Sequence, residues 1–180
     1  MNNKKAFTII ELLVIMGVIV IFTSLFFVDY GRDSNTFALE RVSNKMAQDL
    51  RRTQEMSMSG LIGDVNTNAY GIYFNKGSGS ERQYIIYKNN DANMYYESSS
   101  VDSIKETVIF EKGVKICDIL IDSGSVNSVS VSFQPPDPIN YIDSYYSGHE
   151  ASIVLCAEDD AAKTRRVKIN NTGRIETANP

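Results

Sequence analysis

Histidine, cysteine, proline and tryptophan are scarce in this chain of 180 residues, which contains one His, two Cys, four Pro and no Trp. So few Cys and His residues do not make up the ligand set of a zinc site. The single histidine, His149, lies in a polar stretch beside Glu150, where we expect a solvated side chain and no catalytic base. Phosphate-binding loops and dinucleotide fingerprints are also absent from the sequence. The sequence therefore predicts no enzyme, no metal site and no cofactor.

Basic residues are also fewer than acidic ones. Lys and Arg number 18 against 22 Asp and Glu, which gives a formal net charge of −4. Loss of the first six residues, which include Lys4 and Lys5 and no acid, would take the charge to −6, that is −4 minus 2. An acidic protein has no general attraction for nucleic acid, so DNA binding would need a local basic patch.

The two cysteines, Cys117 and Cys156, each lie in a strand-like run. An oxidising compartment permits a disulfide between them, and closing a loop of this length would stabilise the fold by roughly 3–4 kcal/mol. Two cysteines on separate strands also fit a second interpretation, as small buried apolar side chains that never meet. We predict the disulfide and keep the reduced pair as the alternative.

One long apolar run, Phe7 to Val28, follows the first residues. As a helix, its 22 residues would be about 33 Å long, which matches the hydrocarbon core of a bilayer and predicts a transmembrane helix. Lys4 and Lys5 would then stay in the cytoplasm under the positive-inside rule. A secretory signal peptide is the alternative, but its apolar region is shorter and ends in a small-residue cleavage site that this run lacks.

Glu11 is the only charged residue in the apolar run. A carboxylate at the centre of a membrane helix costs roughly 2.5–3.5 kcal/mol, and less near an interface. One explanation is placement among lipid headgroups, since Glu11 follows Phe7 by only four residues. The other is a specific cationic partner, and the neighbouring residues favour it.

The segment Lys4-Lys5-Ala6-Phe7-Thr8-Ile9-Ile10-Glu11-Leu12-Leu13-Val14 resembles the processing motif of type IV prepilins, in which a basic leader and a small residue precede Phe-Thr-Leu-Ile-Glu-Leu. The resemblance implies that a prepilin peptidase cuts between Ala6 and Phe7 and methylates the new amine of Phe7. It also implies that Glu11 sets the assembly register by pairing with the Phe7 amine of a neighbouring subunit. Without its partner, either the Glu11 carboxylate or the Phe7 amine would be energetically unfavourable in apolar surroundings.

The chain departs from that family in two places. Ala6 stands where the family usually has Gly, and the run 7–28 lacks the Pro that many major pilins carry in this helix. A helix without proline has no proline kink. The second departure favours a minor pilin or pseudopilin over a major pilin.

After the apolar run, residues 29–60 are typical of an amphipathic continuation of the helix, whose charged residues we expect on a solvated face. Residues 61–180 are typical of short strands joined by turns. The segments 89–103 and 134–150 are polar and are expected to be exposed loops. The helical stripe consists of Leu39, Val42, Met46, Leu50 and Thr53, and the expected strands are 69–74, 83–87, 107–111, 114–121, 128–133, 151–156, 166–169 and 174–177.

The predicted fold class is α+β, with a long N-terminal α-helix, first transmembrane and then amphipathic, packed on a β-rich, mainly antiparallel globular head. The predicted domains are a cleaved leader over 1–6, a transmembrane and filament-core helix over 7–28, its amphipathic continuation over 29–60, and the head over 61–180.

A second resemblance links residues 47–60 and 167–175 to the helix end and the final hairpin of GspH/FimT-type pseudopilins and minor pilins. Some members of that family bind DNA through a Gly-Arg-x-Arg turn. The matching residues here are Gly173-Arg174-Ile175-Glu176, with Glu in place of the second Arg. The candidate DNA contacts are Arg165, Arg166, Lys168 and Arg174, and the reversal of charge at Glu176 weighs against them.

The two resemblances imply a structural subunit, a minor pilin or pseudopilin, of a type IV pilus or a type II secretion pseudopilus. The alternatives are a membrane-tethered module at a filament tip that captures DNA or a secreted substrate, and a major pilin. Implied partners are other subunits, the prepilin peptidase, an inner-membrane assembly platform and the lipid bilayer, with DNA not expected. The implied location is the cytoplasmic membrane, with a single pass and the head outside the cytoplasm, and then the filament.

Overall fold

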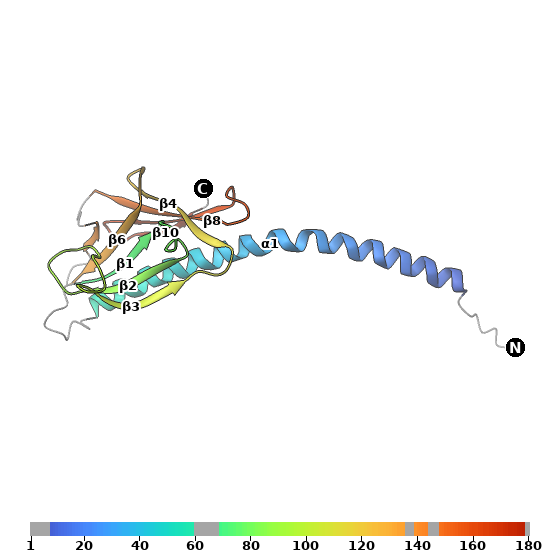
Figure 1. Ribbon diagram of the computed structural model, residues 1–180, viewed down its shortest axis with the longest axis horizontal. Helices are drawn as coiled ribbons and strands as arrows, with labels where there is room; N and C mark the ends of the chain where they lie inside the picture. Colours follow the sequence, from blue (N-terminus) through green and yellow to red (C-terminus); the bar gives the residue numbers. More distant parts are fainter. Residues whose placement is uncertain (1–7, 60–68, 136–138, 144–147, 179–180) are drawn as a thin grey trace. The chain divides into compact units, whose positions relative to one another are not determined.

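Figure 1 shows a computed structural model, which describes residues 8–59, 69–135, 139–143 and 148–178, with the side chains of 25–34 left out of the description. The chain divides into two compact units, Met1–Asn35 and Thr36–Pro180. The described elements are α1 (Ile9–Met58), β1 (Ala69–Asn75), β2 (Gln83–Asn89), β3 (Ser103–Ile109), β4 (Val114–Ile121), β5 (Gly124–Val126), β6 (Ser128–Gln134), β7 (Ile139–Ile142), β8 (Glu150–Ala157), β9 (Thr164–Asn170) and β10 (Ile175–Ala178).

All of these strands belong to the second unit and form two antiparallel sheets. Sheet A has the order β3-β2-β1-β6-β7 and sheet B the order β10-β9-β8-β4-β5. The β9–β10 hairpin turns at Gly173, whose φ of 82° is in the left-handed region that glycine adopts without steric cost. The side chain of Asn170 closes this turn by accepting hydrogen bonds from the N–H groups of Thr172 and Arg174.

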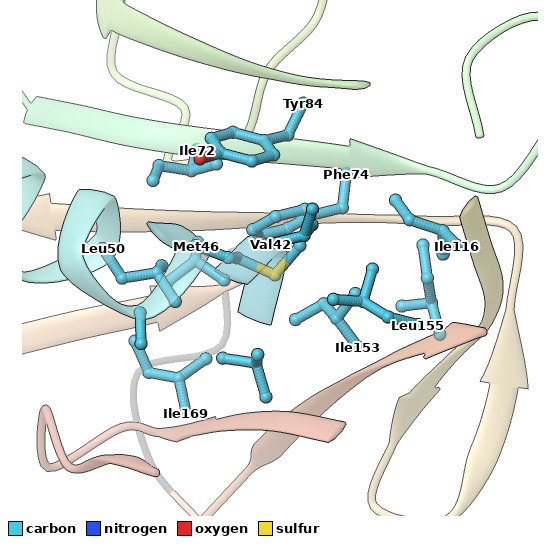
Figure 2. Packing of buried hydrophobic residues seen from close by; sticks show 14 of the residues in the cluster. Val42, Met46, Leu50, Ile72, Phe74, Tyr84, Ile116, Ile153, Leu155 and Ile169 are labelled. Atoms are coloured by element: carbon cyan, nitrogen blue, oxygen red, sulfur yellow. The ribbon is translucent and has the colours of Figure 1, made fainter. Parts of the chain in front are cut away.

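Within the second unit, the apolar stripe of α1 joins both sheets in one core. Met46 and Leu50 have no exposed surface, and they belong to the same cluster as Phe74 of sheet A and Ile153 of sheet B. Figure 2 draws Met46 of α1, Phe74 of sheet A and Ile153 of sheet B among the side chains of this cluster. The three- and four-residue spacing of the stripe places these side chains on one face of the helix, which explains how a single helix contacts two sheets.

Polar groups also enter this core, and one of them contradicts the expected solvated face. Asp49 is 6% exposed, and its Oδ2 accepts a hydrogen bond of 2.5 Å from the hydroxyl of Tyr84, which is itself 1% exposed. Lys45 contributes a cation 3.5 Å away. Burial, followed by the hydrogen bond to Asp49, raises the pKa of Tyr84. The carboxylate is buried because it has a donor in the sheet, which the periodicity of the helix alone does not reveal.

The membrane-related predictions are wrong. No helix in the described part of the chain is long and apolar enough to cross a membrane. The predicted transmembrane segment over 7–28 and the predicted single-pass location in the cytoplasmic membrane are corrected by this finding.

The predicted fold class is corrected in the same respect. The fold class named a long N-terminal helix that begins as a membrane span, and the described part of the chain has no helix that could cross a membrane. The helix itself is α1 (Ile9–Met58), whose residues divide between the two compact units at Asn35. The residues from Thr36 onward pack in the core of the second unit. The remainder of the fold is mostly β, in two antiparallel sheets of five strands each.

Candidate functional site

The apolar residues of α1 in the first unit form an exposed surface. The side chains from Ile9 to Phe22 point outward all round the helix, with exposed fractions from 47% to 89% among the large apolar residues. A surface of this kind is unusual on a soluble monomer and indicates a site of interaction. These residues are Ile9, Ile10, Leu12, Leu13, Val14, Ile15, Met16, Val18, Ile19, Val20, Ile21 and Phe22.

Glu11 lies exposed in the first turn of this helix. Thr8 precedes the helix, and its Oγ1 accepts a hydrogen bond of 3.3 Å from the backbone N–H of Glu11. Thr8 and Glu11 thus have the spacing of a capping box, in which a Glu or Gln follows the capping Thr by three residues. A negative charge in the first turn is also favourable beside the positive end of the helix dipole. Within the monomer, Glu11 therefore has a local role at the start of the helix.

The predicted cleavage and methylation sites, Ala6 and Phe7, lie outside the described residues. The prediction of processing between them remains a prediction.

The predicted disulfide between Cys117 and Cys156 is confirmed. It joins the neighbouring strands β4 and β8 of sheet B, with Cα atoms 5.8 Å apart. Cys117 lies at a break in the β4–β8 register between Ile116 and Asp118. Cys117 is exposed, as the alternation of β4 from Val114 onward places it, whereas Cys156 is fully buried.

The four candidate DNA contacts do not gather into one basic patch. Neighbouring residues of a strand point to opposite faces of the sheet. Arg165 lines a hollow together with Glu40 of α1. Arg166 and Lys168 line a different hollow, on the opposite face of sheet B. Lys168 is paired with Glu150 at 2.9 Å.

Arg174 is 73% exposed at the end of the last hairpin, and it forms an ion pair with Glu176. The acid that departs from the Gly-Arg-x-Arg pattern therefore neutralises the arginine that matches it.

The segment 89–103 differs from its prediction as an exposed loop, because it packs on the outer face of sheet A. The ring of Tyr96 lies 4.9 Å from that of Tyr73 and 5.1 Å from that of Tyr87, measured between centroids. The backbone N–H of Tyr96 also donates to Ser130 Oγ at 2.9 Å. These contacts hold the segment against strands β1, β2 and β6.

A glycine in the middle strand makes room for this packing. Gly71 is paired with Tyr87 on one side and with Ser132 on the other, so the three residues form a row across the sheet. The Tyr87 ring lies over Gly71, where a Cβ atom would be 2.6 Å from the ring, and its hydroxyl meets Ser132 Oγ at 2.7 Å. Burial raises the pKa of Tyr87, which keeps the hydroxyl protonated and able to donate.

Two carboxyl groups of sheet A and its connections are at least partly buried, and neither forms an ion pair among the described residues. Asp102 is 2% exposed and accepts hydrogen bonds from the backbone N–H groups of Glu97 and Asn90. Asp143 is partly buried and accepts one from Ser130 N–H at 2.7 Å. Burial raises the pKa of both carboxyl groups, against the opposing effect of these hydrogen bonds. The ionised form of each therefore destabilises the fold relative to the protonated form.

Replacing Asp143 with Asn should raise the midpoint of thermal unfolding at pH 7.5 by roughly 2–4 °C, the shift given by about 1 kcal/mol in a domain of this size. Asn keeps an oxygen for Ser130 N–H, tolerates the φ of 46° at this position and removes the buried charge. Since the folded pKa is above the unfolded one, the wild type gains stability as pH falls through that window. The advantage of the variant should therefore shrink towards pH 4, as measured by circular dichroism.

The same change at an exposed acid is the control. Glu55 is an exposed acid of α1, and Glu55→Gln, which likewise replaces a carboxylate with an amide, should leave the midpoint unchanged at both pH values. A lower midpoint for Asp143→Asn at pH 7.5 would contradict the prediction.

No cluster of His, Cys, Asp or Glu able to hold a metal ion occurs among the residues that the structure describes. Comparison of the chain with protein-family models, curated proteins and solved structures gives no match. Inference about function therefore rests on the residues and on their geometry.

Proposed function

We propose that this chain is a structural subunit of a pilus-like filament, of the minor pilin or pseudopilin kind, which assembles through the apolar N-terminal part of α1. The observation that carries the proposal is the ring of exposed large apolar side chains from Ile9 to Phe22. Their contact with water is unfavourable by about 25 cal/mol for each Å² of apolar surface. A stable state of the protein needs another surface to cover them.

Copies of the same helix are suited to cover this surface. Its apolar side chains point in every direction, so one helix can contact several neighbours at once. A contact between unlike faces of identical subunits repeats indefinitely unless its rotation closes a ring, and the result is a filament. The second unit has its own core and contributes a folded head to each subunit.

Glu11 supplies the specificity that apolar contacts lack. Its carboxylate would be desolvated when neighbouring helices pack around it, and it then needs a cation. The resemblance at residues 4–14 provides one, the amine that cleavage after Ala6 would create at Phe7 of an adjacent subunit. A displaced register would leave both charges unpaired, so this ion pair would select a single register.

Mass spectrometry of sheared surface filaments tests the proposal. In the source cells, we expect the chain in the filament fraction to begin at Phe7 with a methylated amine. A chain that retains Met1 and never appears in the filament fraction would refute the proposal. The abundance of the chain in that fraction distinguishes a minor subunit from a major one.

Replacing Glu11 with Gln should reduce incorporation into filaments by at least tenfold, the effect of about 1.4 kcal/mol per contact. Gln retains the capping-box spacing with Thr8, so the start of the helix is kept while the charge is lost. Quantitative immunoblotting of filament and cell fractions measures the ratio.

The matched control is Glu55→Gln, which removes the same charge from α1 in the second unit. That variant should assemble normally. If Glu11→Gln enters filaments as efficiently as the wild type, the Glu11 carboxylate has only its local role at the start of the helix.

A further inference from the structure

The outer face of sheet B contains a polar hollow that the proposed function does not use. Leu120 of β4, Ser152 of β8 and Lys168 of β9 are register partners, so they lie side by side on one face. The row next to it, Ile119, Ile153 and Val167, points the other way into the core. The hollow on the outer face has a volume of about 100 Å³ and is lined by Leu120, Asp122, Ser123, Glu150, Ser152, Arg166 and Lys168.

Two buried polar atoms at this hollow have no hydrogen-bond partner among the described residues. They are Oγ of Ser152, whose residue is 5% exposed, and Nε of Arg166. An unpartnered buried donor costs about 1–3 kcal/mol, and more when it is charged. Two such donors at one cavity point to a group that accepts hydrogen bonds from both.

The other charged groups at the hollow already have partners. Lys168 Nζ contacts Glu150 Oε1 at 2.9 Å. Asp122 Oδ2 contacts Nδ1 of His149, and its Oδ1 accepts the backbone N–H of Glu150 at 2.9 Å. The hydrogen bonds with Glu150 N–H and His149 lower the pKa of Asp122 and outweigh the opposing effect of burial. Arg166 is therefore the charged group lining this hollow that has no ion pair among the described residues.

We propose that this hollow binds a single carboxylate group, held by the guanidinium of Arg166 and the hydroxyl of Ser152. The planar fork of arginine matches the two oxygens of a carboxylate, and hydrogen bonds to ionised groups are the stronger ones. A dianion such as phosphate is disfavoured, because the carboxylates of Asp122 and Glu150 line the same hollow. The carboxylate comes from a small free acid or from an acidic side chain of a partner protein.

Titration of the full-length protein with sodium acetate tests the proposal, with chloride exchanged to keep the ionic strength constant and a mild detergent covering the apolar helix. The measurement is the NMR signal of the Arg166 Nε–H group, identified by its loss in Arg166→Gln. We expect a saturable shift. Ser152→Ala should raise the half-saturation concentration at least about tenfold, as expected for loss of a charge-assisted hydrogen bond.

Arg165→Gln is the matched control, because it removes the same charge from the adjacent residue, on the opposite face of the strand. Its Arg166 signal should respond to acetate as in the wild type. Absence of a saturable shift in the wild type overturns the proposal, as does phosphate binding at least as tight as acetate binding. If Ser152→Ala has the same half-saturation concentration for acetate as the wild type, the Ser152 hydroxyl does not bind the carboxylate.

A further titration identifies the source of the carboxylate. N-acetylglutamate amide, which presents only a side-chain carboxylate, should bind more tightly than acetate if the site takes an acidic side chain of a protein, and more weakly if it takes a small free acid. A titration with a short DNA duplex tests whether the arginines belong to a general basic surface instead. Binding of the duplex that is weakened equally by Arg165→Gln and Arg166→Gln would indicate a general basic surface and overturn the proposal.

Discussion

Replacing Met46 with Ala should lower the free energy of unfolding of the head by about 3 kcal/mol, within the range of 2–5 kcal/mol found for such buried side chains. Met46 has no exposed surface, and it lies in the cluster that joins α1 to both sheets. Truncation loses the transfer free energy of the side chain and leaves a cavity that neither sheet can close without moving its strands. Both terms act in the same direction.

Met58→Ala is the control for this prediction. Met58 is also on α1 but is 54% exposed, so its truncation should change the free energy of unfolding by less than about 0.5 kcal/mol. Urea unfolding followed by near-ultraviolet circular dichroism of the ten tyrosines measures both variants in a chain without tryptophan. Equal losses for the two variants would contradict the packing of α1 in the core.

The second large effect concerns the disulfide. Replacing Cys117 with Ser and Cys156 with Ala together should lower the free energy of unfolding by roughly 3–4 kcal/mol. The bridge spans 39 positions of sequence and limits the conformations of the unfolded chain. Ala fits the fully buried position of Cys156, and Ser suits the exposed position of Cys117.

A reductant provides the internal control. Reduction of the wild type should cause a similar loss of stability, whereas the double variant should not respond, because it has no other cysteine. Wild-type stability that is insensitive to complete reduction, verified by thiol labelling, would contradict the prediction.

Most of the strands were predictable because their signals are local. Alternating apolar residues and Gly or Asn turns occur within single strands and hairpins, and the predicted run 114–121 coincides with β4 (Val114–Ile121). The short strands β5 and β7 were missed. Strand β5 has only three residues and β7 only four, too few for alternation to be recognised. Their pairing with β4 and β6 is what makes them strands.

The membrane prediction failed for a different reason. It was based on the length and hydropathy of residues 7–28 alone, and the described part of the chain has no helix that meets the requirements for crossing a membrane. The same apolar side chains remain the basis of the proposed assembly, because their exposure requires a covering surface whatever that surface is.

The candidate sites divide in the same way between local and tertiary information. The apolar stripe of α1 and the isolated charge of Glu11 follow from residues close together in the sequence. The carboxylate hollow was missed, since Ser152 carries no sequence signal and Arg166 was considered only as a contact for DNA. Register pairing of Ser152 with Lys168 was needed to place them at one hollow.

By itself, the sequence determined the apolar N-terminal run with its single acid, the stripe that α1 presents to the core, and most of the strands. Tertiary structure alone decided that Asp49 is buried against Tyr84, that the segment 89–103 covers sheet A, and that Arg165 and Arg166 face different hollows. The physical reason is that periodicity describes one element at a time. Burial, pKa and pairing depend on partners that are distant in the sequence, and these are brought together only when the sheets and the helix pack.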